Sequence, residues 1–273
     1  MAQNTVATHR EVSDLSSEVR VLARGLAILR AFEPANEWRT NAELSAVTGL
    51  PKPTVSRISA NLTEAGYLLY SAERATYRLS TSVLALGYVA ASHPNLVVTA
   101  RPLMKEFADE HNVSVVLASP DRDSMVCNEV VHGEAMLFTL RIRSGSRLRM
   151  GQSAVGRALI GSMGDAERQR AMARLAQTDP ESWSTLNDQL KPLVAQMQRQ
   201  QFCIASGTVE HGTNGVAVVI DTPEGAHSFA LGCAAPSSIL SVTHIKTTVA
   251  PSLIKLKRRL ETELSSMTQS MET

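Results

Sequence analysis

The sequence predicts an α+β protein with two folded domains, a small one at residues 19–80 and a larger one at residues 99–266. Three observations predict this class. A chain of 273 residues is too long for one ordinary domain and too short for three. The first domain shows three helical patterns followed by two strand-like runs. The second mixes helices with apolar strand candidates but lacks regular βαβ alternation, which favours an antiparallel sheet.

The ends of the chain and the segment between the two domains differ from the rest. Residues 1–18 are polar and lack an apolar period, so we expect a disordered tail there, with a second tail at 267–273. Residues 81–98 contain an apolar helical pattern that His93-Pro94-Asn95 interrupts, which predicts a linker helix. The predicted order is therefore tail, small domain, linker helix, large domain and tail.

The composition excludes several classes of protein. Hydrophobic residues make up 44 % and charged residues 19 %, which suits a soluble globular fold. No window reaches the roughly 18 uninterrupted apolar residues of a membrane span, and the first twenty residues lack the features of a secretory signal. Cys127, Cys203 and Cys233 lie far apart with no CxxC pair, which argues against disulfides or a zinc ribbon and indicates the cytoplasm.

The small domain is predicted to begin with two helices. Apolar residues at three- and four-residue spacing predict an amphipathic first helix that Pro34 closes. Its apolar stripe consists of Val19, Leu22, Leu26, Leu29 and Phe32. Thr40 and Glu43 have the Thr-x-x-Glu spacing of a capping box, in which each side chain bonds the other residue's backbone N–H. They open a short second helix, which Gly49 ends.

A third helix and a hairpin complete this domain. Pro53 suits the first turn of a helix, and Gly66 suits its end. The apolar face consists of Val55, Ile58 and Leu62, and the polar faces carry Lys52, Thr54, Ser56, Arg57, Ser59 and Asn61. Residues 67–70 and 76–79 are aromatic-rich strand candidates joined by a polar turn. Three helices followed by a hairpin are the layout of a winged helix-turn-helix.

Charge is unevenly divided between the two domains. Residues 19–80 carry eight basic and five acidic residues, whereas residues 99–273 carry eighteen of each. A basic helix-turn-helix joined to a neutral body is the asymmetry expected of a DNA-binding protein with a second function. The expected DNA contacts are Thr40, Lys52, Thr54, Ser56, Arg57, Arg74 and Arg78. Among these, Arg57 is suited to a guanine edge in the major groove. The alternative is a structural module whose polar face meets water.

The large domain is predicted to contain an antiparallel sheet and several helices. Apolar strand candidates lie at 113–119, 125–131, 135–142, 202–206, 216–221 and 228–235. Helices fit residues 96–111, 154–163, 165–177, 185–201 and 241–266. Pro223-Glu224-Gly225 forms a turn between the last two strands, so we expect these two to pair antiparallel.

Three stretches of the sequence resemble one known family. The run ELSAVTGLPKPTVSRISANLTEAGYL, followed by ATYRLS, closely resembles the DNA-binding domain of the IclR family of bacterial transcriptional regulators. ARPLMKEFADEHNVSVVLA and SRLRMGQSAVGRALI resemble segments of that family's effector domain. The resemblance implies a one-component regulator whose winged helix binds double-stranded operator DNA and whose larger domain binds a small organic acid. It also implies that homodimers can pair into a dimer of dimers. We expect a cytoplasmic protein that needs no cofactor.

The same resemblance indicates which positions contact the effector. Carried over one by one, they are Leu137, Leu140, Leu148, Ala154, Val155, Ala205, Gly215, Gly232 and Ala234. The last four are Ala or Gly where keto-acid sensors carry polar or larger side chains, so we expect a larger and less polar cavity. An aromatic carboxylate of the benzoate or phthalate type fits it, with N–H groups near residues 153–156 on the carboxylate, and implies control of a catabolic operon. The alternative is that larger neighbours refill the space.

A second hypothesis is an enzyme whose α+β domain carries catalysis while the helix-turn-helix serves only assembly. No G-x-S-x-G motif and no Ser/His/Asp set can be placed, so we expect no catalytic residue. The seven histidines never have i, i+4 spacing with a carboxylate, so we expect no metal site. For a regulator, the apolar helix from Val83 to Ala90 is the segment expected to pair with a second copy.

Overall fold

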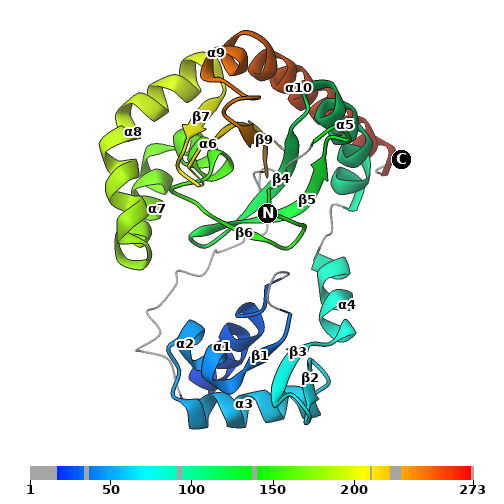
Figure 1. Ribbon diagram of the computed structural model, residues 1–273, viewed down its shortest axis with the longest axis vertical. Helices are drawn as coiled ribbons and strands as arrows, with labels where there is room; N and C mark the ends of the chain where they lie inside the picture. Colours follow the sequence, from blue (N-terminus) through cyan, green and yellow to red (C-terminus); the bar gives the residue numbers. More distant parts are fainter. Residues whose placement is uncertain are drawn as a thin grey trace, which may run out of the picture. The chain divides into compact units, whose positions relative to one another are not determined.

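The computed structural model describes residues 17–33, 37–90, 94–136, 140–209, 211–221 and 229–271. They form two compact units that divide between residues 92 and 93, and each unit is described by itself (Figure 1). Most of the predicted tail at residues 1–18 lies outside the described residues. In each unit, helices and strands occur largely in separate runs along the chain, so the predicted α+β class is confirmed.

The first unit contains helices and a three-stranded antiparallel sheet. Its elements are α1 Ser17–Arg30, β1 Arg39–Thr40, α2 Asn41–Thr48, α3 Lys52–Glu64, β2 Leu68–Ser71, β3 Thr76–Leu79 and α4 Thr81–Ala90. The strand order is β1-β3-β2, and β2 with β3 forms the wing (Figure 1). The predicted winged helix-turn-helix is confirmed. The sequence does not predict β1, because a two-residue strand has no alternation to recognise.

Local hydrogen bonds that the sequence specifies hold the helix-turn-helix together. Thr40 Oγ1 accepts a hydrogen bond from Glu43 N at 3.2 Å, and Glu43 Oε2 accepts one from Thr40 N at 2.7 Å, which confirms the capping box. Gly49 ends α2 with φ = +71°, a conformation that favours glycine. The Gly49 N–H donates to the Ser45 carbonyl, and Ser45 Oγ donates to the Leu50 carbonyl at 2.6 Å. α3 therefore starts after a three-residue turn.

A small apolar core joins the helices of this unit to its sheet. Its buried side chains are Ile28, Ala31, Leu44, Val55, Ile58, Leu68 and Tyr77. The apolar stripe predicted for α1 is only partly used by this core. Leu22 is 64 % and Leu26 52 % exposed, whereas Ile28 is fully buried and Leu29 packs beside it. The N-terminal half of α1 thus leaves an apolar face uncovered within the unit.

The second unit is built on a six-stranded sheet. Its helices are α5 Pro94–His111, α6 Ala154–Ser162, α7 Asp165–Thr178, α8 Pro180–Gln200, α9 Val242–His244 and α10 Ala250–Met271, with a π-helical turn, η2, at Ile245–Val249. Its strands are β4 Ser114–Asp121, β5 Ser124–His132, β6 Arg147–Arg149, β7 Cys203–Ser206, β8 Thr213–Ile220 and β9 Phe229–Pro236. All neighbours pair antiparallel in the order β6-β5-β4-β9-β8-β7, which confirms the predicted antiparallel sheet.

Helices cover both faces of this sheet (Figure 1). α5 and α10 pack on one face, where Val115 and Val218 point. α6 packs on the other face with α7 and α8 beside it, and Val116 and Ala217 point that way. Neighbouring residues serve opposite cores because side chains alternate along a strand. The N-terminal end of α6 consequently lies against the middle strands of the sheet.

The strand expected at 135–142 is wrong. Its described residues, 135–136 and 140–142, form no strand, and β6 pairs with β5 in its place. Gly145, with φ = +86°, turns the chain back only after this segment. Cys127 N then donates to the Ser146 carbonyl at 2.9 Å, so pairing with β5 begins there. The turn predicted at residues 223–225 lies outside the described residues, although β8 and β9 pair antiparallel as expected.

The helix expected at 241–266 has a different course. The chain passes from α9 through the π-helical turn η2 into α10, and α10 continues to Met271, into the segment predicted as a tail. Pro251 has no N–H to donate to the carbonyl four residues earlier, and its ring crowds that carbonyl. The Ala250 N–H instead donates to the Ile245 carbonyl, five residues back. The widened turn thus lies just before a proline that has no N–H of its own to donate.

Candidate functional site

The outer side of α3 presents polar side chains to solvent. Exposed or half-exposed are Lys52, Thr54, Ser56 and Arg57. All four lie in the first two turns of α3, the part of a recognition helix that enters the major groove. Ser59, expected on a polar face, is fully buried instead. It lies four residues after Val55 and three before Leu62, and therefore shares their inward face.

Two arginines of the wing lie against one tryptophan. The Arg78 Cζ atom is 5.0 Å and the Arg74 Cζ atom 5.8 Å from the centre of the Trp38 ring. Such distances are those of cation–π contacts. Both arginines remain exposed, so the contact orients them without removing them from solvent. Sequence reasoning missed Trp38, whose one signal was an aromatic residue just before the capping box.

Thr40 is placed differently from the other expected DNA contacts. Its Oγ1 donates to Glu43 Oε2 at 2.8 Å and accepts from the Glu43 N–H at 3.2 Å. The hydrogen bonds from the Thr40 N–H and hydroxyl lower the pKa of the Glu43 carboxyl. The Thr40 hydroxyl proton is therefore engaged, and it is not available to a phosphate oxygen while the capping box is formed.

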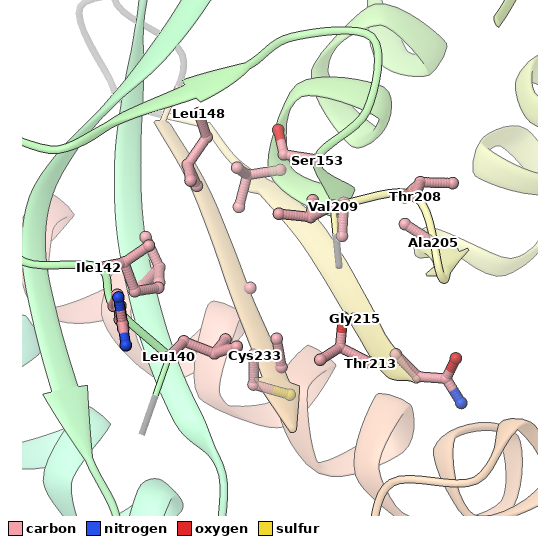
Figure 2. Close-up of a pocket in the computed structure, with 17 residues that line it drawn as sticks. Leu140, Ile142, Leu148, Ser153, Ala205, Thr208, Val209, Thr213, Gly215 and Cys233 are labelled. Atoms are coloured by element: carbon pink, nitrogen blue, oxygen red, sulfur yellow. The ribbon is translucent and has the colours of Figure 1, made fainter. Parts of the chain in front are cut away.

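A pocket of about 120 Å³ lies in the second unit where the N-terminus of α6 meets the sheet (Figure 2). Eight of the nine expected effector positions line it, namely Leu140, Leu148, Ala154, Val155, Ala205, Gly215, Gly232 and Ala234. The ninth, Leu137, lies outside the described residues. The eight positions come from four strands, from α6 and from the segment before β6. The fold thus brings together residues that are far apart in the sequence.

The pocket lining is largely apolar and carries few polar side chains. Within the described part of the lining, Arg141 is the one charged residue. Ser153, Thr208, Thr213 and Asn214 add uncharged polar groups. Sequence reasoning missed Arg141 and Thr208 as lining residues. Arg141 lay inside a falsely predicted strand, and its one signal was a basic residue between two apolar ones.

The N-terminus of α6 supplies backbone donors to the pocket. Ser153 caps the helix, and its Oγ accepts a hydrogen bond from the Gly156 N–H at 3.2 Å. The first N–H groups of a helix lack intrahelical partners and carry partial positive charge, so those of Ala154 and Val155 are suited to an anion. Glycine is needed at position 156, because a Cβ there would lie 2.2 Å from the Met150 carbonyl oxygen.

The two pocket glycines differ in how much space they leave. A Cβ at Gly232 would lie 2.8 Å from Val155 Cγ1 and 3.1 Å from Ala217 Cβ, so neighbouring side chains occupy that space. A Cβ at Gly215 would lie 3.3 Å from Ala154 Cβ, a closer approach than most real contacts. At Gly232, therefore, neighbouring side chains fill the space that a larger residue would need, as the alternative supposes for this position. The absence of a larger residue there reflects the close packing of α6 on β9.

The described residues offer little for other kinds of chemistry. They contain no group of three His, Cys, Asp or Glu side chains that could hold a metal ion. Burial raises the pKa of Cys127 and Cys203 to about 12 and raises that of Cys233 as well, so these thiols are uncharged at neutral pH. No helix in the described ranges is long and apolar enough to cross a membrane.

Two domains of one protein family match the sequence. Residues 21–71 match the IclR helix-turn-helix domain, and residues 88–261 match the bacterial transcriptional regulator IclR C-terminal domain. The Pca regulon regulatory protein of Pseudomonas putida is 26 % identical over 241 residues, which cover 88 % of this chain and 82 % of that protein. The matched families consist of transcriptional regulators and not of enzymes, so the enzyme hypothesis gains no support.

Solved structures of regulators have the same fold. An IclR family transcriptional regulator from Brucella abortus has a TM-score of 0.78 at 32 % identity, over 93 % of this chain and 99 % of that chain. An IclR homologue from Microbacterium hydrocarbonoxydans, solved in complex with 4-hydroxybenzoate, has a TM-score of 0.70 at 21 % identity. That match covers 90 % of this chain and 99 % of the homologue.

Proposed function

The chain belongs to the IclR family of bacterial transcriptional regulators, and from this premise we propose that it controls a catabolic operon in response to an aromatic carboxylate. The winged helix-turn-helix binds the operator in the cytoplasm, and the pocket of the second unit binds the effector. The observation that carries the effector proposal is a pocket of single-ring size, apolar apart from groups that attract one anion.

In the proposed complex, α3 lies in the major groove of double-stranded operator DNA. Arg57 donates two hydrogen bonds to a guanine edge, the pairing that best distinguishes guanine from other bases. The remaining contacts are Lys52, Thr54 and Ser56 on α3 and Arg74 and Arg78 on the wing. Contacts to phosphates supply affinity and register, whereas contacts to base edges supply specificity. Thr40 is left out because its hydroxyl proton is engaged in the capping box.

We also propose that two copies bind DNA together. Exposed apolar side chains remain on both outer helices of the first unit, including Leu22 and Leu26 on α1 and Leu84 and Leu86 on α4. Apolar surface of this kind on a small unit favours a covering partner, and a second copy provides a self-complementary one. A two-fold dimer then recognises an inverted repeat whose half-sites are spaced by turns of the DNA helix. A dimer of dimers forms if the larger domains also associate.

The size of the pocket supports a single-ring effector. Its volume is about 120 Å³. An engineered apolar cavity of about 150 Å³ binds benzene, so a pocket of this size is suited to one aromatic ring. Glyoxylate or pyruvate, by contrast, would leave much of the apolar wall without contacts. The structural homologue with bound 4-hydroxybenzoate is in keeping with a single ring.

The charge of the lining supports a carboxylate on that ring. The Arg141 guanidinium and the N–H groups at the start of α6 both attract an anion. In the described part of the lining, no acidic side chain opposes them. Leu140 and Leu148 supply apolar surface for the ring. This arrangement favours one carboxylate on an aromatic ring over a fully apolar ligand.

Isothermal titration calorimetry on the full-length protein tests the effector class. The probes are benzoate, 4-hydroxybenzoate and phthalate, with pyruvate and glyoxylate as the contrasting group. We expect saturable binding of at least one aromatic acid and none of the keto acids. Binding of pyruvate or glyoxylate without binding of any aromatic acid contradicts the proposal.

The variant Ala234→Phe tests whether the effector binds in this pocket. Its phenyl group is itself the size of benzene and fills a cavity of this volume. We expect Ala234→Phe to lose binding of aromatic acids and to bind operator DNA normally in the absence of effector. Ala166→Phe is the matched control, because Ala166 is exposed on α7 and does not line the pocket. Normal binding of aromatic acids by Ala234→Phe excludes this pocket as the effector site.

A further inference from the structure

A second hollow of about 350 Å³ lies beside the effector pocket, at the edge strand β7. Ala205 and Thr208 line both cavities, but the chemistry of the second one is different. Its polar lining comes from α6, α8, β7 and η2 and includes Arg157, Gln189, Gln196, Ser206 and Lys246. Within the described lining, two side chains are basic and none is acidic. The hollow therefore carries positive charge that its own walls do not balance.

Arg157 is the unusual residue of this hollow. Its side chain is only 5 % exposed, and its Nη2 donates a hydrogen bond to the Gln189 side-chain oxygen. The Nε–H is buried and has no hydrogen-bond partner among the described residues. A buried donor without a partner is destabilising, and a buried charge without a counter-charge is more so. Arg157 thus lines the hollow with a charge that no acidic side chain of the described lining balances.

The Cys203 side chain does not supply a counter-charge for Arg157. The Cys203 thiol would favour the charged guanidinium if it ionised. Its Sγ instead donates to the Ala154 carbonyl at 3.2 Å, and burial raises its pKa to about 12. Cys203 is therefore uncharged at neutral pH, whereas a guanidinium stays protonated in proteins. Burial of the Arg157 guanidinium lowers its pKa, as expected for a positive charge that no neighbouring negative charge stabilises.

Lys246 supplies the second positive charge. It is exposed on the π-helical turn η2, and no ion pair of Lys246 occurs within the described ranges. The amides of Gln189 and Gln196 and the hydroxyl of Ser206 add hydrogen-bonding groups around the hollow.

We propose that this hollow binds a small dianionic oxyanion of the phosphate class, held between Arg157 and Lys246. Two cations without an acidic neighbour in the described lining match a dianion, and a guanidinium suits the oxygens of phosphate because it donates several hydrogen bonds from one planar group. The volume leaves room beyond the anion itself, so the ligand is either free phosphate or the phosphate group of a small metabolite. The site does not depend on the identity of the aromatic effector.

Titration of the full-length protein with inorganic phosphate tests the proposal. The titration uses phosphorus NMR and calorimetry in a chloride buffer of constant ionic strength. We expect saturable binding that sulfate displaces and that acetate, a monoanion, displaces far less. Glycerol 3-phosphate in a parallel titration distinguishes a phosphate ester from free phosphate by its higher affinity. Absence of saturable binding of both phosphate compounds overturns the proposal.

Two variants and a control locate the bound anion. Lys246→Gln should weaken phosphate binding by about tenfold, since a hydrogen bond to a charged group contributes that much or more. Arg157→Gln should abolish it; if this buried substitution prevents folding, Lys246→Gln alone decides. Lys255→Gln changes an exposed lysine on α10 outside the hollow and should bind phosphate normally. Equal affinity in wild type and Lys246→Gln, or loss of binding in Arg141→Gln alone, refutes the site.

Discussion

Replacing Gly232 with alanine tests whether the packing of α6 on β9 limits the effector pocket. The new Cβ would lie 2.8 Å from Val155 Cγ1, 3.1 Å from Ala217 Cβ and 3.1 Å from the Val216 carbonyl oxygen. Two of these neighbours belong to the adjacent strand, and Val155 is a stiff β-branched residue buried on α6. Extra methyl groups in a tightly packed core cost about 1–3 kcal/mol, and three close contacts place this substitution near 2 kcal/mol.

The structure also provides controls for this substitution. Gly215→Ala should cost less than about 1 kcal/mol, because its Cβ would lie 3.3 Å from Ala154 Cβ and no closer to anything else. Val155→Ala removes the atom nearest to the new methyl group. In the double variant, the cost of Gly232→Ala should therefore fall by about 0.5 kcal/mol or more, as expected for residues in contact.

Urea unfolding followed by tryptophan fluorescence and circular dichroism measures these effects. Trp183 lies on α8 and reports on the second unit, and Trp38→Phe removes the signal of the first unit. The unfolding free energies of the single and double variants then give the coupling between positions 155 and 232. Wild-type stability of Gly232→Ala, or an unchanged cost in the Val155→Ala background, would refute the conclusion that α6 occupies the space beside this glycine.

Further predictions concern DNA binding, assembly and acid stability. Arg57→Ala should cost about 1–3 kcal/mol of operator affinity and relax base choice at one position, whereas Lys52→Ala should weaken all sequences alike and lower the salt slope by about one unit; equal affinities of both variants and wild type in filter binding would exclude α3. Light scattering should show at least a dimer at micromolar concentration, and Leu84→Lys should reduce the fraction of protein in the dimer. A monomeric wild type would contradict the proposed dimer. Thr40→Ala should cost about 1 kcal/mol through loss of the helix cap, measured by thermal unfolding. Because the pKa of Glu43 is lowered in the fold, the stability that its carboxylate contributes is present above the ordinary carboxyl pKa and is lost as pH falls through the lowered value. The melting temperature of Glu43→Gln should therefore fall less than that of the wild type between pH 7 and pH 3. An equal fall in both proteins would contradict this.

Sequence reasoning succeeded where the determining interactions are local. The Thr40–Glu43 capping box, the glycine that ends α2 and the polar face of α3 all depend on residues a few positions apart. The eight expected effector positions that line one pocket were predicted from family resemblance and not from such local rules. The same local rules failed at residues 135–142, where an apolar run predicted a strand but the described residues 135–136 and 140–142 form none.

The sequence by itself determined the element types, the winged helix-turn-helix and the antiparallel sheet, because apolar periods and caps are properties of consecutive residues. Only the tertiary structure decided which residues of distant elements meet. It places Arg141 in the lining of the proposed effector pocket, fills the space beside Gly232 with Val155, and buries Arg157 without an acidic partner among the described residues. The reason is that these contacts depend on how closely α6 approaches the sheet, and that distance is set by the packing of whole elements rather than by any short run of sequence.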